Sequence, residues 1–499
     1  MAADDAGGPT LRPGPSRVVS TEVRTTEQGR RNPAPSKIEH PSREERKARG
    51  KAARTEAPLE SHASFAPEVR LDPIDLLEEQ AKSRVPELVP IRYGRMGVSS
   101  FTFYRGAALI MASDLSTTRS SDLLVQLCGD AHLSNFGMFG SPERHLVFDI
   151  NDFDETSIGP WEWDVKRLAA SLEIGGRDNG FTDKERREAV LAGVRGYREA
   201  MRSFADMNNL EVWYAHLDMD EVLPEIKAQT DKKRAKALDK ALAKMRTRDS
   251  MQAFTKLTEE VDGEPRIVSL PPLIVPLNEL LHGEEREAVE ESLVAILRSY
   301  RKTLETDRRH LLEEFRFVEV ARKVVGVGSV GTRAWVVLML GIDNRDPLFL
   351  QVKEAEESVL ERFAGKSEYS NHGQRVVAGQ RLMQASSDIF LGWDRITGID
   401  GKQRDFYFRQ FRDWKGSVEI NSLRPPGLAI YARLCGWTLA RAHARSGDRV
   451  AISSYLGKSD NFDRAIAEFS NAYADQNERD YEAMQAAVKQ GRIKAETGL

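Results

Sequence analysis

The part of the sequence that most constrains the fold is LLVQLCGDAHLSNFGMFGSPERHLVFDINDFDET, residues 123–156. Its first apolar run predicts a buried strand over 123–127, and a second strand is predicted after the Gly-Ser-Pro turn. The loop after the first strand carries Asp130 and Asn135, and Asp152 follows the second strand. Because strand, polar loop, hairpin and carboxylates form a compact unit, we expect these three side chains to meet at one point.

Asp130, Asn135 and Asp152 are useful together in one kind of chemistry. Phosphoryl transfer requires a carboxylate that orients or deprotonates the acceptor hydroxyl, and oxygen ligands for the Mg²⁺ that bridges the phosphates. An Asp, an Asn five positions later and an Asp after the next strand supply both. Taken singly, each acid is more simply a surface-loop residue or a helix cap. His132 is expected to pack or to hydrogen-bond rather than to bind a metal.

A glycine-rich unit lies much later in the chain, between two apolar runs. Its GxGxxG pattern includes a serine and consists of Gly326, Gly328, Ser329 and Gly331. A helix would follow the loop in a dinucleotide-binding fingerprint, whereas strands are predicted here over 333–340 and 348–352, the second ending at Lys353. Glycines let the backbone approach phosphate oxygens, so we expect this loop and Lys353 to bind nucleotide phosphates. An exposed lysine at a strand end is the alternative for Lys353 alone.

The first unit, GDAHLSNFG…LVFDINDFDE, resembles the GDxHxxN…DFD signature of aminoglycoside and choline kinases, members of the protein-kinase-like superfamily. The resemblance implies that Asp130 is the catalytic base, Asn135 a metal ligand and Asp152 the main metal ligand. The stretch PWEWDVKRLA resembles the DPxxDLA segment of that group, in which Asp164 would brace the catalytic loop. The sequence departs from the pattern at Cys128, where the group has a histidine.

The second unit resembles the kinase hairpin that covers the phosphates, with Lys353 as the lysine of its third strand. Kinases place a glutamate on the following helix as the partner of this lysine. The helix predicted over 373–384 contains no acid and offers Gln380 instead, so the sequence leaves the partner of Lys353 open. The acids that lie close to the lysine in sequence are Glu356, Glu357 and Glu361.

The order of the units is unusual, because a kinase has the glycine-rich hairpin before the catalytic loop. The stretch 405–416 resembles the strand that leads to the hinge, where backbone groups would receive adenine. The helix predicted over 428–444 resembles the helix that directly precedes the catalytic loop in aminoglycoside kinases, yet it follows that loop here. A circular permutation explains this order, since permutation is tolerated when the cut falls in an exposed loop. The alternative is an unrelated fold with two coincidental motifs.

We therefore expect an α+β fold that is protein-kinase-like, two-lobed and circularly permuted, with a mostly helical large lobe and a small antiparallel-sheet lobe. The proline-rich start of the chain has no aromatic residue before Phe65 and is predicted to be disordered. The expected parts are a disordered tail at 1–65, a catalytic-loop and helical part at 66–315, a glycine-rich-loop part at 316–415 and C-terminal helices at 416–499 that complete the large lobe.

Two of the expected helices are predicted in detail. Thr182 and Glu185 form a capping-box pattern. One apolar helix face follows it at Val190, Val194, Tyr197, Met201 and Phe204. The same spacing recurs near the C-terminus at Phe462, Ile466, Phe469 and Tyr473.

From about Arg84 to about Gly457 the chain also resembles an uncharacterised bacterial family, domain of unknown function 2252. The resemblance is carried by IRYGRM, FYRG, CGDAHLSNFG, NDFDET, PWEWDVKRLAAS and GQR. It is long and specific, but it implies no reaction. Three arginines of the first motifs are candidates for binding phosphate or an anionic acceptor, or for structural ion pairs. They are Arg92, Arg95 and Arg105.

The composition limits the possible partners. Lys and Arg number 73 against 77 Asp and Glu, a balance that argues against nucleic acid as a partner. No apolar run is long enough to cross a membrane. Because the chain has only two cysteines and its N-terminus has no secretory signal, we expect a cytoplasmic protein.

Three functions are compatible with these features. The first is an ATP- and Mg²⁺-dependent phosphotransferase that acts on a small-molecule acceptor, with Asp130 orienting the nucleophile. The second keeps the fold but transfers AMP, because the nucleotide could lie reversed, or modifies a protein. The third is a non-catalytic nucleotide-binding regulatory protein, against which the presence of both Asp130 and Asp152 argues. The sequence identifies neither the acceptor nor the oligomeric state.

Overall fold

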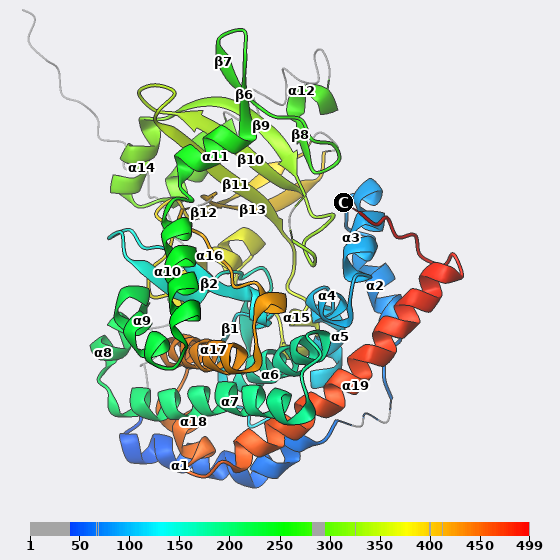
Figure 1. The fold of residues 1–499 in the computed structure, drawn as a ribbon, viewed down its shortest axis with the longest axis vertical. Helices are drawn as coiled ribbons and strands as arrows, with labels where there is room; N and C mark the ends of the chain where they lie inside the picture. The colour runs from blue at the N-terminus through cyan, green and yellow to red at the C-terminus, as the bar shows by residue number, and fades with distance from the viewer. Residues whose placement is uncertain are drawn as a thin grey trace, which may run out of the picture. The chain divides into compact units, whose positions relative to one another are not determined.

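The structure, a computed structural model, describes residues 40–498 except 66, 68, 282–294, 325, 399–400 and 412. All the elements below lie in the compact unit Arg43–Leu499. This unit combines helices with antiparallel sheets (Figure 1). The predicted α+β class is therefore confirmed. None of the described helices has the length and apolar character that crossing a lipid bilayer requires.

The largest sheet has six antiparallel strands in the order β12-β13-β11-β10-β9-β8 and occupies the upper part of Figure 1. Its central strands are rich in β-branched and aromatic residues, which favour strands, and all of β11 is buried. The register places Lys353 of β11 opposite Ala334 of β10 and Tyr407 of β13. The strands are β8 (Ile274–Pro276), β9 (Arg316–Lys323), β10 (Ala334–Leu340), β11 (Pro347–Ala355), β12 (Gly392–Thr397) and β13 (Gln403–Gln410).

The glycine-rich segment forms the turn between β9 and β10, and helix α16 (His372–Met383) lies between β11 and β12 in the chain. The predicted strands and helix are thus present, with β11 continuing past Lys353 to Ala355. One boundary is wrong. Strand β8 joins this sheet through β9, although the sequence assigned it to the helical part that ends at 315.

The helical part is built around α6 (Trp161–Asp178), α7 (Asp183–Asp206), α17 (Pro425–Ser446) and α19 (Asn461–Lys489). The capping box of Thr182 and Glu185 is present. Both predicted apolar faces are buried. Helices α7 and α17 pack closely along each other, and a Cβ on Gly436 would lie 2.0 Å from the carbonyl oxygen of Gly193. This approach requires glycine at position 436.

Two small sheets connect the helices with the six-stranded sheet. Strands β1 (Leu124–Leu127) and β4 (Ser157–Pro160) form an antiparallel pair. Strands β2 (Phe136–Gly140) and β3 (Leu146–Ile150) form the predicted hairpin, which β5 (Leu217–Asp218) extends. The polar loop joins β1 to β2, and the acidic turn joins β3 to β4. Because β1 pairs with β4 and β2 with β3, these two connections lie next to each other.

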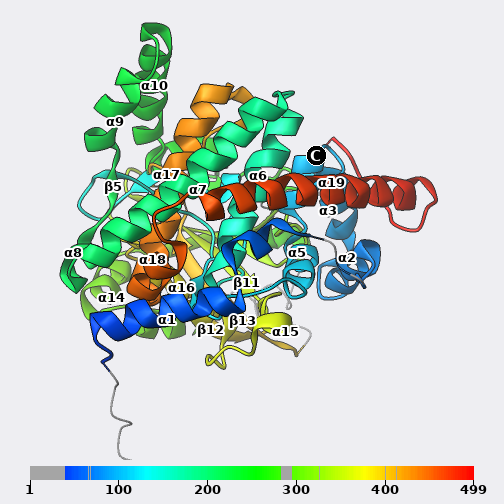
Figure 2. The same ribbon diagram turned by 90° about the horizontal axis from the view of Figure 1, so that it is seen from below.

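The N-terminal prediction needs a correction. Residues 1–39 of the predicted disordered tail lie outside the described residues, but α1 (Arg43–Glu56) is a helix and Leu59–Ala63 is a short 3₁₀ helix. Helix α1 packs against α18 (Arg449–Leu456), as Figure 2 shows. Gly50 makes this contact possible, because a Cβ there would lie 2.0 Å from the carbonyl oxygen of Ala451.

The remaining elements surround these parts. The helices are α2 (Pro73–Ala81), α3 (Val89–Met96), α4 (Ser100–Arg105), α5 (Ala108–Leu115), α8 (Asn209–Tyr214), α9 (Met219–Ala228), α10 (Lys232–Arg246), α11 (Ser250–Leu257), α12 (Leu277–Leu280), α14 (Thr306–Glu313) and α15 (Glu361–Ala364). The 3₁₀ helices are Pro86–Leu88, Leu133–Asn135, Arg301–Thr303 and Ile420–Ser422. A further hairpin consists of β6 (Thr258–Val261) and β7 (Glu264–Ile267).

Candidate functional site

The loop that follows β1 is held in place from helix α6. The carboxylate of Asp164, in the first turn of α6, accepts hydrogen bonds from the backbone N–H groups of Cys128 (2.8 Å) and Gly129 (3.1 Å). Nε2 of His443, near the end of α17, lies 3.3 Å from the same carboxylate. Asp164 therefore braces the loop, as the sequence predicted.

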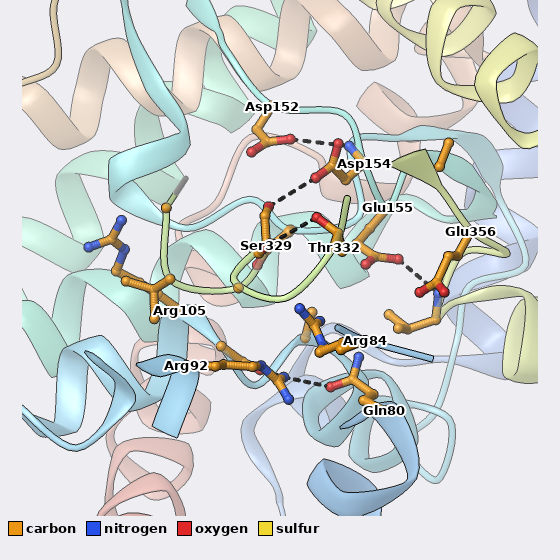
Figure 3. A pocket seen from close by; sticks show the side chains of 18 of the residues that line it. Gln80, Arg84, Arg92, Arg105, Asp152, Asp154, Glu155, Ser329, Thr332 and Glu356 are labelled. Carbon is orange, nitrogen blue, oxygen red and sulfur yellow. Dashed lines mark hydrogen bonds between the residues drawn. The ribbon is translucent and has the colours of Figure 1, made fainter. Parts of the chain in front are cut away.

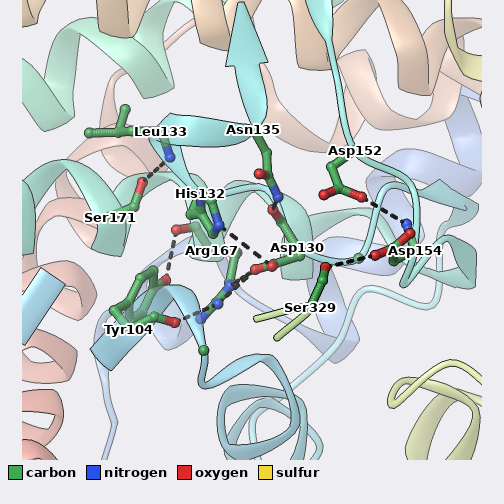
Figure 4. Close-up of polar contacts among 12 residues, drawn as sticks. Tyr104, Asp130, His132, Leu133, Asn135, Asp152, Asp154, Arg167, Ser171 and Ser329 are labelled. Atoms are coloured by element: carbon green, nitrogen blue, oxygen red, sulfur yellow. Dashed lines mark hydrogen bonds and ion pairs between the residues drawn. The ribbon is translucent and has the colours of Figure 1, made fainter. Parts of the chain in front are cut away.

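Asp130 lies in this loop and forms an ion pair with Arg167 of α6 (Figure 4). Nε of Arg167 donates to Oδ1 of Asp130 over 2.8 Å, and its Nη2 lies 2.7 Å from the same oxygen. Nδ2 of Asn135 donates to the backbone carbonyl of Asp130 over 2.8 Å. Asp130 and Asn135 are thus adjacent, as expected, whereas Arg167 was not predicted to contact Asp130.

The acidic turn after β3 meets the glycine-rich unit. Nζ of Lys353 forms an ion pair with Asp154 and donates to Oγ of Ser329 over 2.7 Å. Ser329 also donates to Oδ2 of Asp154 over 3.2 Å. The hydroxyl of Tyr407, on β13, donates to the other carboxylate oxygen over 2.7 Å. One carboxylate therefore connects the lysine strand β11, the glycine-rich loop and strand β13.

Asp154 is the partner of Lys353 that the sequence left open. The three glutamates nearest in sequence make other contacts: Ser83 bonds Glu356, Lys366 pairs with Glu357, and Arg375 pairs with Glu361. Gln380, the other candidate, donates to Gln384. The sequence carried one signal for Asp154, namely a second aspartate two positions after Asp152 combined with the absence of an acid in α16.

Arg375 of α16 holds the acidic turn from behind. Its side chain is 2% exposed. Its guanidinium donates to the carbonyl oxygens of Asp154 (2.9 Å), Glu356 (2.8 Å) and Thr156. Arg375 of α16 therefore fixes the backbone at Asp154 and at Thr156.

These units line a cavity of about 230 Å³, drawn in Figure 3. Asp130, Asn135 and Asp152 line it from one unit, and Gly326, Gly328 and Ser329 line it from the other. Lys353 does not line the cavity, because its side chain is 3% exposed and lies behind Asp154 and Ser329. Gly331 does not line it either. It adopts a φ of +92°, a left-handed conformation that favours glycine.

Burial and neighbouring charges set the protonation of these acids. Burial raises the pKa of Asp130, although Arg167 opposes the shift. Burial and the carboxylate of Asp154 raise the pKa of Asp152. Burial alone would raise the pKa of Asp154 as well, but Lys353 and the hydroxyl of Tyr407 outweigh it and lower that pKa. Of the two aspartates in the turn, Asp154 is the one held ionised by its partners.

The donor set fits Mg²⁺ bound together with phosphates. Among the described residues, no three His, Cys, Asp or Glu side chains cluster closely enough to hold a metal ion by themselves. Mg²⁺ normally takes one or two protein oxygens and completes its shell with phosphates and water. Oδ1 of Asn135 accepts no hydrogen bond within the described part of the chain. One oxygen of Asp152 is also free there, and the other accepts from the N–H of Asp154 over 3.2 Å.

The stretch predicted to receive adenine is partly engaged with β2. Its first part is strand β13, as predicted. Gly416, at its end, exchanges two backbone hydrogen bonds of 2.8 Å with Met138. The N–H of Trp414 donates to the carbonyl of Arg248 over 2.8 Å. The role of this stretch in adenine binding stays a prediction.

Comparison with known proteins identifies a family for this chain. A family model described as "Uncharacterized protein conserved in bacteria (DUF2252)" matches residues 84–487. The match begins just before α3 and ends within α19, so it covers both units of the cavity. No curated protein matches the chain, and no solved structure matches it.

Proposed function

We propose that this chain, which belongs to the bacterial family DUF2252, is a phosphotransferase that uses ATP and Mg²⁺. One observation carries the proposal. The loop with Asp130 and the turn with Asp152 line the same cavity as the glycine-rich loop, although they come from distant parts of the chain. The lysine behind that loop, Lys353, is bonded to Asp154 of the same acidic turn.

The connectivity of the six-stranded sheet supports a kinase-like small lobe. Strand β9, the glycine-rich loop, β10 and β11 with its lysine are followed by helix α16 and then by β12 and β13. This is the order in which a kinase presents its phosphate-covering loop, its lysine strand and its next helix. In our proposal, Asp154 takes the place of the helix glutamate as the acid that pairs with the lysine.

The contacts of α17 support a circular permutation. The N–H of Gln126, in β1, donates to Oγ of Ser446, the last residue of α17, over 3.2 Å. His443, near the same end, contacts the Asp164 that braces the loop after β1. The end of this helix therefore lies where a helix leading directly into β1 would end. Joining the two in sequence would restore the usual kinase order.

The residues of the cavity then divide the chemical work. Asp130 orients the acceptor hydroxyl and takes its proton, and Arg167 holds the carboxylate in position. Asn135 and Asp152 would hold Mg²⁺, which offsets the charge on the phosphates. The backbone of the glycine-rich loop binds the phosphates, and Lys353 holds Asp154 and Ser329 in position behind the cavity wall. Catalysis of this type depends on positioning and electrostatic stabilisation.

Turnover of ATP in the presence of a mixture of small hydroxylated and amino-bearing compounds tests this proposal. We expect Mg²⁺-dependent ADP formation by the wild type and an acceptor that gains the mass of one phosphate. Asp130→Asn should reduce turnover by at least about 100-fold, the scale of a positioned acid–base group, and keep the ATP affinity. Asp343→Asn, in the turn between β10 and β11, is the control.

Each outcome of this experiment has a clear meaning. Turnover by Asp130→Asn at the wild-type rate would refute the assigned role. A product that gains AMP would replace phosphoryl transfer by AMP transfer. Nucleotide binding with no turnover at all would favour a regulatory protein.

A further inference from the structure

The cavity has an arginine-rich wall that the proposed roles leave unused. The wall comes from the segment around α3 and α4 and consists of Arg84, Arg92 and Arg105. Figure 3 shows Arg84 and Arg92 on the side of the cavity opposite Asp152 and Asp154. Within the described part of the chain, no carboxylate lies within ion-pair distance of any of the three. The alternative of structural ion pairs is therefore wrong for Arg92 and Arg105.

Arg92 is the most unusual of the three, because its side chain is fully buried. Nη2 donates to Oε1 of Gln80 over 2.8 Å and to the carbonyl of Gly106 over 3.1 Å. Its Nε and Nη1 have no hydrogen-bond partner among the described residues. A buried guanidinium without an acid is costly, and burial together with Arg84 lowers its pKa. An anion in the cavity would supply the missing charge.

Arg84 and Arg105 extend this wall toward the glycine-rich loop. Arg84 donates to the carbonyl of Val330, and its Nε has no hydrogen-bond partner in the part of the chain that the structure describes. The backbone oxygen of Arg105 would lie 3.1 Å from a Cβ on Gly328, so the loop packs directly against this arginine. Nε of Arg105 also has no hydrogen-bond partner within the described ranges. Arg105 lines the same cavity as the proposed base Asp130. Burial lowers the pKa of Arg105, and the charge of Asp130 opposes this shift.

Four glutamates also line the cavity, and each has another partner. Glu354 pairs with Arg333, and Glu357 pairs with Lys366. Oε2 of Glu155 accepts from the N–H of Val359 over 2.8 Å, and burial raises the pKa of Glu155 to about 7. Glu356 accepts from the hydroxyl of Ser83 over 3.1 Å. The guanidinium N–H groups of this wall that have no partner among the described residues can therefore donate to an oxyanion.

We propose that Arg84, Arg92 and Arg105 bind a phosphate group of the acceptor, so that the substrate is a small hydroxylated phosphate monoester. This inference rests on the proposed phosphotransferase function. The acceptor hydroxyl lies at Asp130 while its phosphate lies against the arginine wall. In the reaction, the hydroxyl oxygen forms a bond to the γ-phosphorus as the bond from that phosphorus to the ADP oxygen breaks. The hydroxyl proton passes to Asp130.

Calorimetric titration with inorganic phosphate tests the wall without knowledge of the acceptor. The full-length protein is first saturated with Mg²⁺ and a non-hydrolysable ATP analogue, and phosphate is then added. We expect phosphate to bind this loaded protein. Arg105→Met and Arg84→Met should each weaken its binding by about 10- to 100-fold, the scale of one charged hydrogen bond. The affinity for the ATP analogue should change less than about threefold.

Matched variants and a second anion serve as controls. Arg105→Lys keeps a charge but loses the bidentate geometry, and we expect an intermediate affinity. Arg362→Met removes an exposed arginine that pairs with Glu79 outside the cavity, and its phosphate affinity should equal that of the wild type. Circular dichroism and melting temperatures verify folding. Acetate is titrated in parallel.

Several results would overturn the inference. If Arg105→Met binds phosphate as tightly as the wild type does, the arginine wall is not the phosphate site. Phosphate that binds the protein without the ATP analogue but not the loaded protein would assign the arginines to the nucleotide instead of the acceptor. Acetate binding as tight as phosphate binding would indicate a carboxylate substrate. If the wild type binds phosphate through the arginines but binds no nucleotide, the proposed function fails, and the acceptor role fails with it while the anion site stands.

Discussion

The ion pair between Lys353 and Asp154 gives the sharpest prediction about how the site is held together. The lysine side chain is 3% exposed and the aspartate side chain 25% exposed. Removing one partner of a fully buried pair costs about 3–5 kcal/mol, because the other charge is left uncompensated. Asp154→Asn leaves Lys353, the more buried partner, without a counter-charge, so we expect the free energy of unfolding to fall by about 3 kcal/mol. Lys353→Met leaves an acid that water and Tyr407 still solvate, so its cost should be about 2 kcal/mol.

A double-mutant cycle separates the pair from its surroundings. The double variant leaves no unpaired buried charge. Its destabilisation should therefore be about 2 kcal/mol smaller than the sum of the destabilisations of the two single variants. Urea unfolding monitored by fluorescence supplies the free energies. The exposed pair Arg345–Asp343, with side chains 87% and 41% exposed, is the control, and its coupling should stay below about 1 kcal/mol. A coupling below about 0.5 kcal/mol between Lys353 and Asp154 would refute the reasoning.

Three further predictions concern pH and packing. Because burial raises the pKa of Glu155 to about 7, its ionisation opposes folding as the pH rises from about 4.5 to 7. The free energy of unfolding of Glu155→Gln, relative to that of the wild type, should therefore rise by about 1–2 kcal/mol from pH 5 to pH 8. A difference in melting temperature between the two proteins that is the same at pH 5 and pH 8 would contradict this. Gly50→Ala should lower the free energy of unfolding by about 1–3 kcal/mol, because the new methyl group meets the Ala451 carbonyl. A melting temperature within about 1 °C of that of the wild type would show that α1 does not pack there. Asp164→Asn keeps one acceptor for the loop amides and should cost about 1–2 kcal/mol and slow ATP turnover; unchanged urea midpoint and turnover would exclude its bracing role.

The sequence predicted the local units well because their patterns are local. Alternating and continuous apolar runs locate strands such as β3 and β10, and the spacing of apolar residues defines the buried face of α7. The type and spacing of Asp130, Asn135 and Asp152 also placed three cavity residues correctly. These signals depend only on neighbours along the chain.

Long-range contacts explain what the sequence missed. The sequence did not single out Asp154, because its pairing with Lys353 depends on how β11 meets the turn after β3. Helix α1 is so polar that its composition indicated disorder, whereas its packing on α18 stabilises it. The sequence allowed Arg92 to form a structural ion pair or to bind an anion. Only the structure distinguishes these interpretations, because it shows Arg92 buried with no acid within ion-pair distance among the described residues.

The central claim is that two distant units of this chain bind a metal-chelated nucleotide in one cavity. The most direct test is the affinity of the wild type and of Asp152→Asn for the non-hydrolysable ATP analogue, measured by calorimetry with and without Mg²⁺. We predict that Mg²⁺ tightens binding by the wild type at least about 10-fold and has little effect on Asp152→Asn. Binding by the wild type that is absent or indifferent to Mg²⁺ would contradict the account.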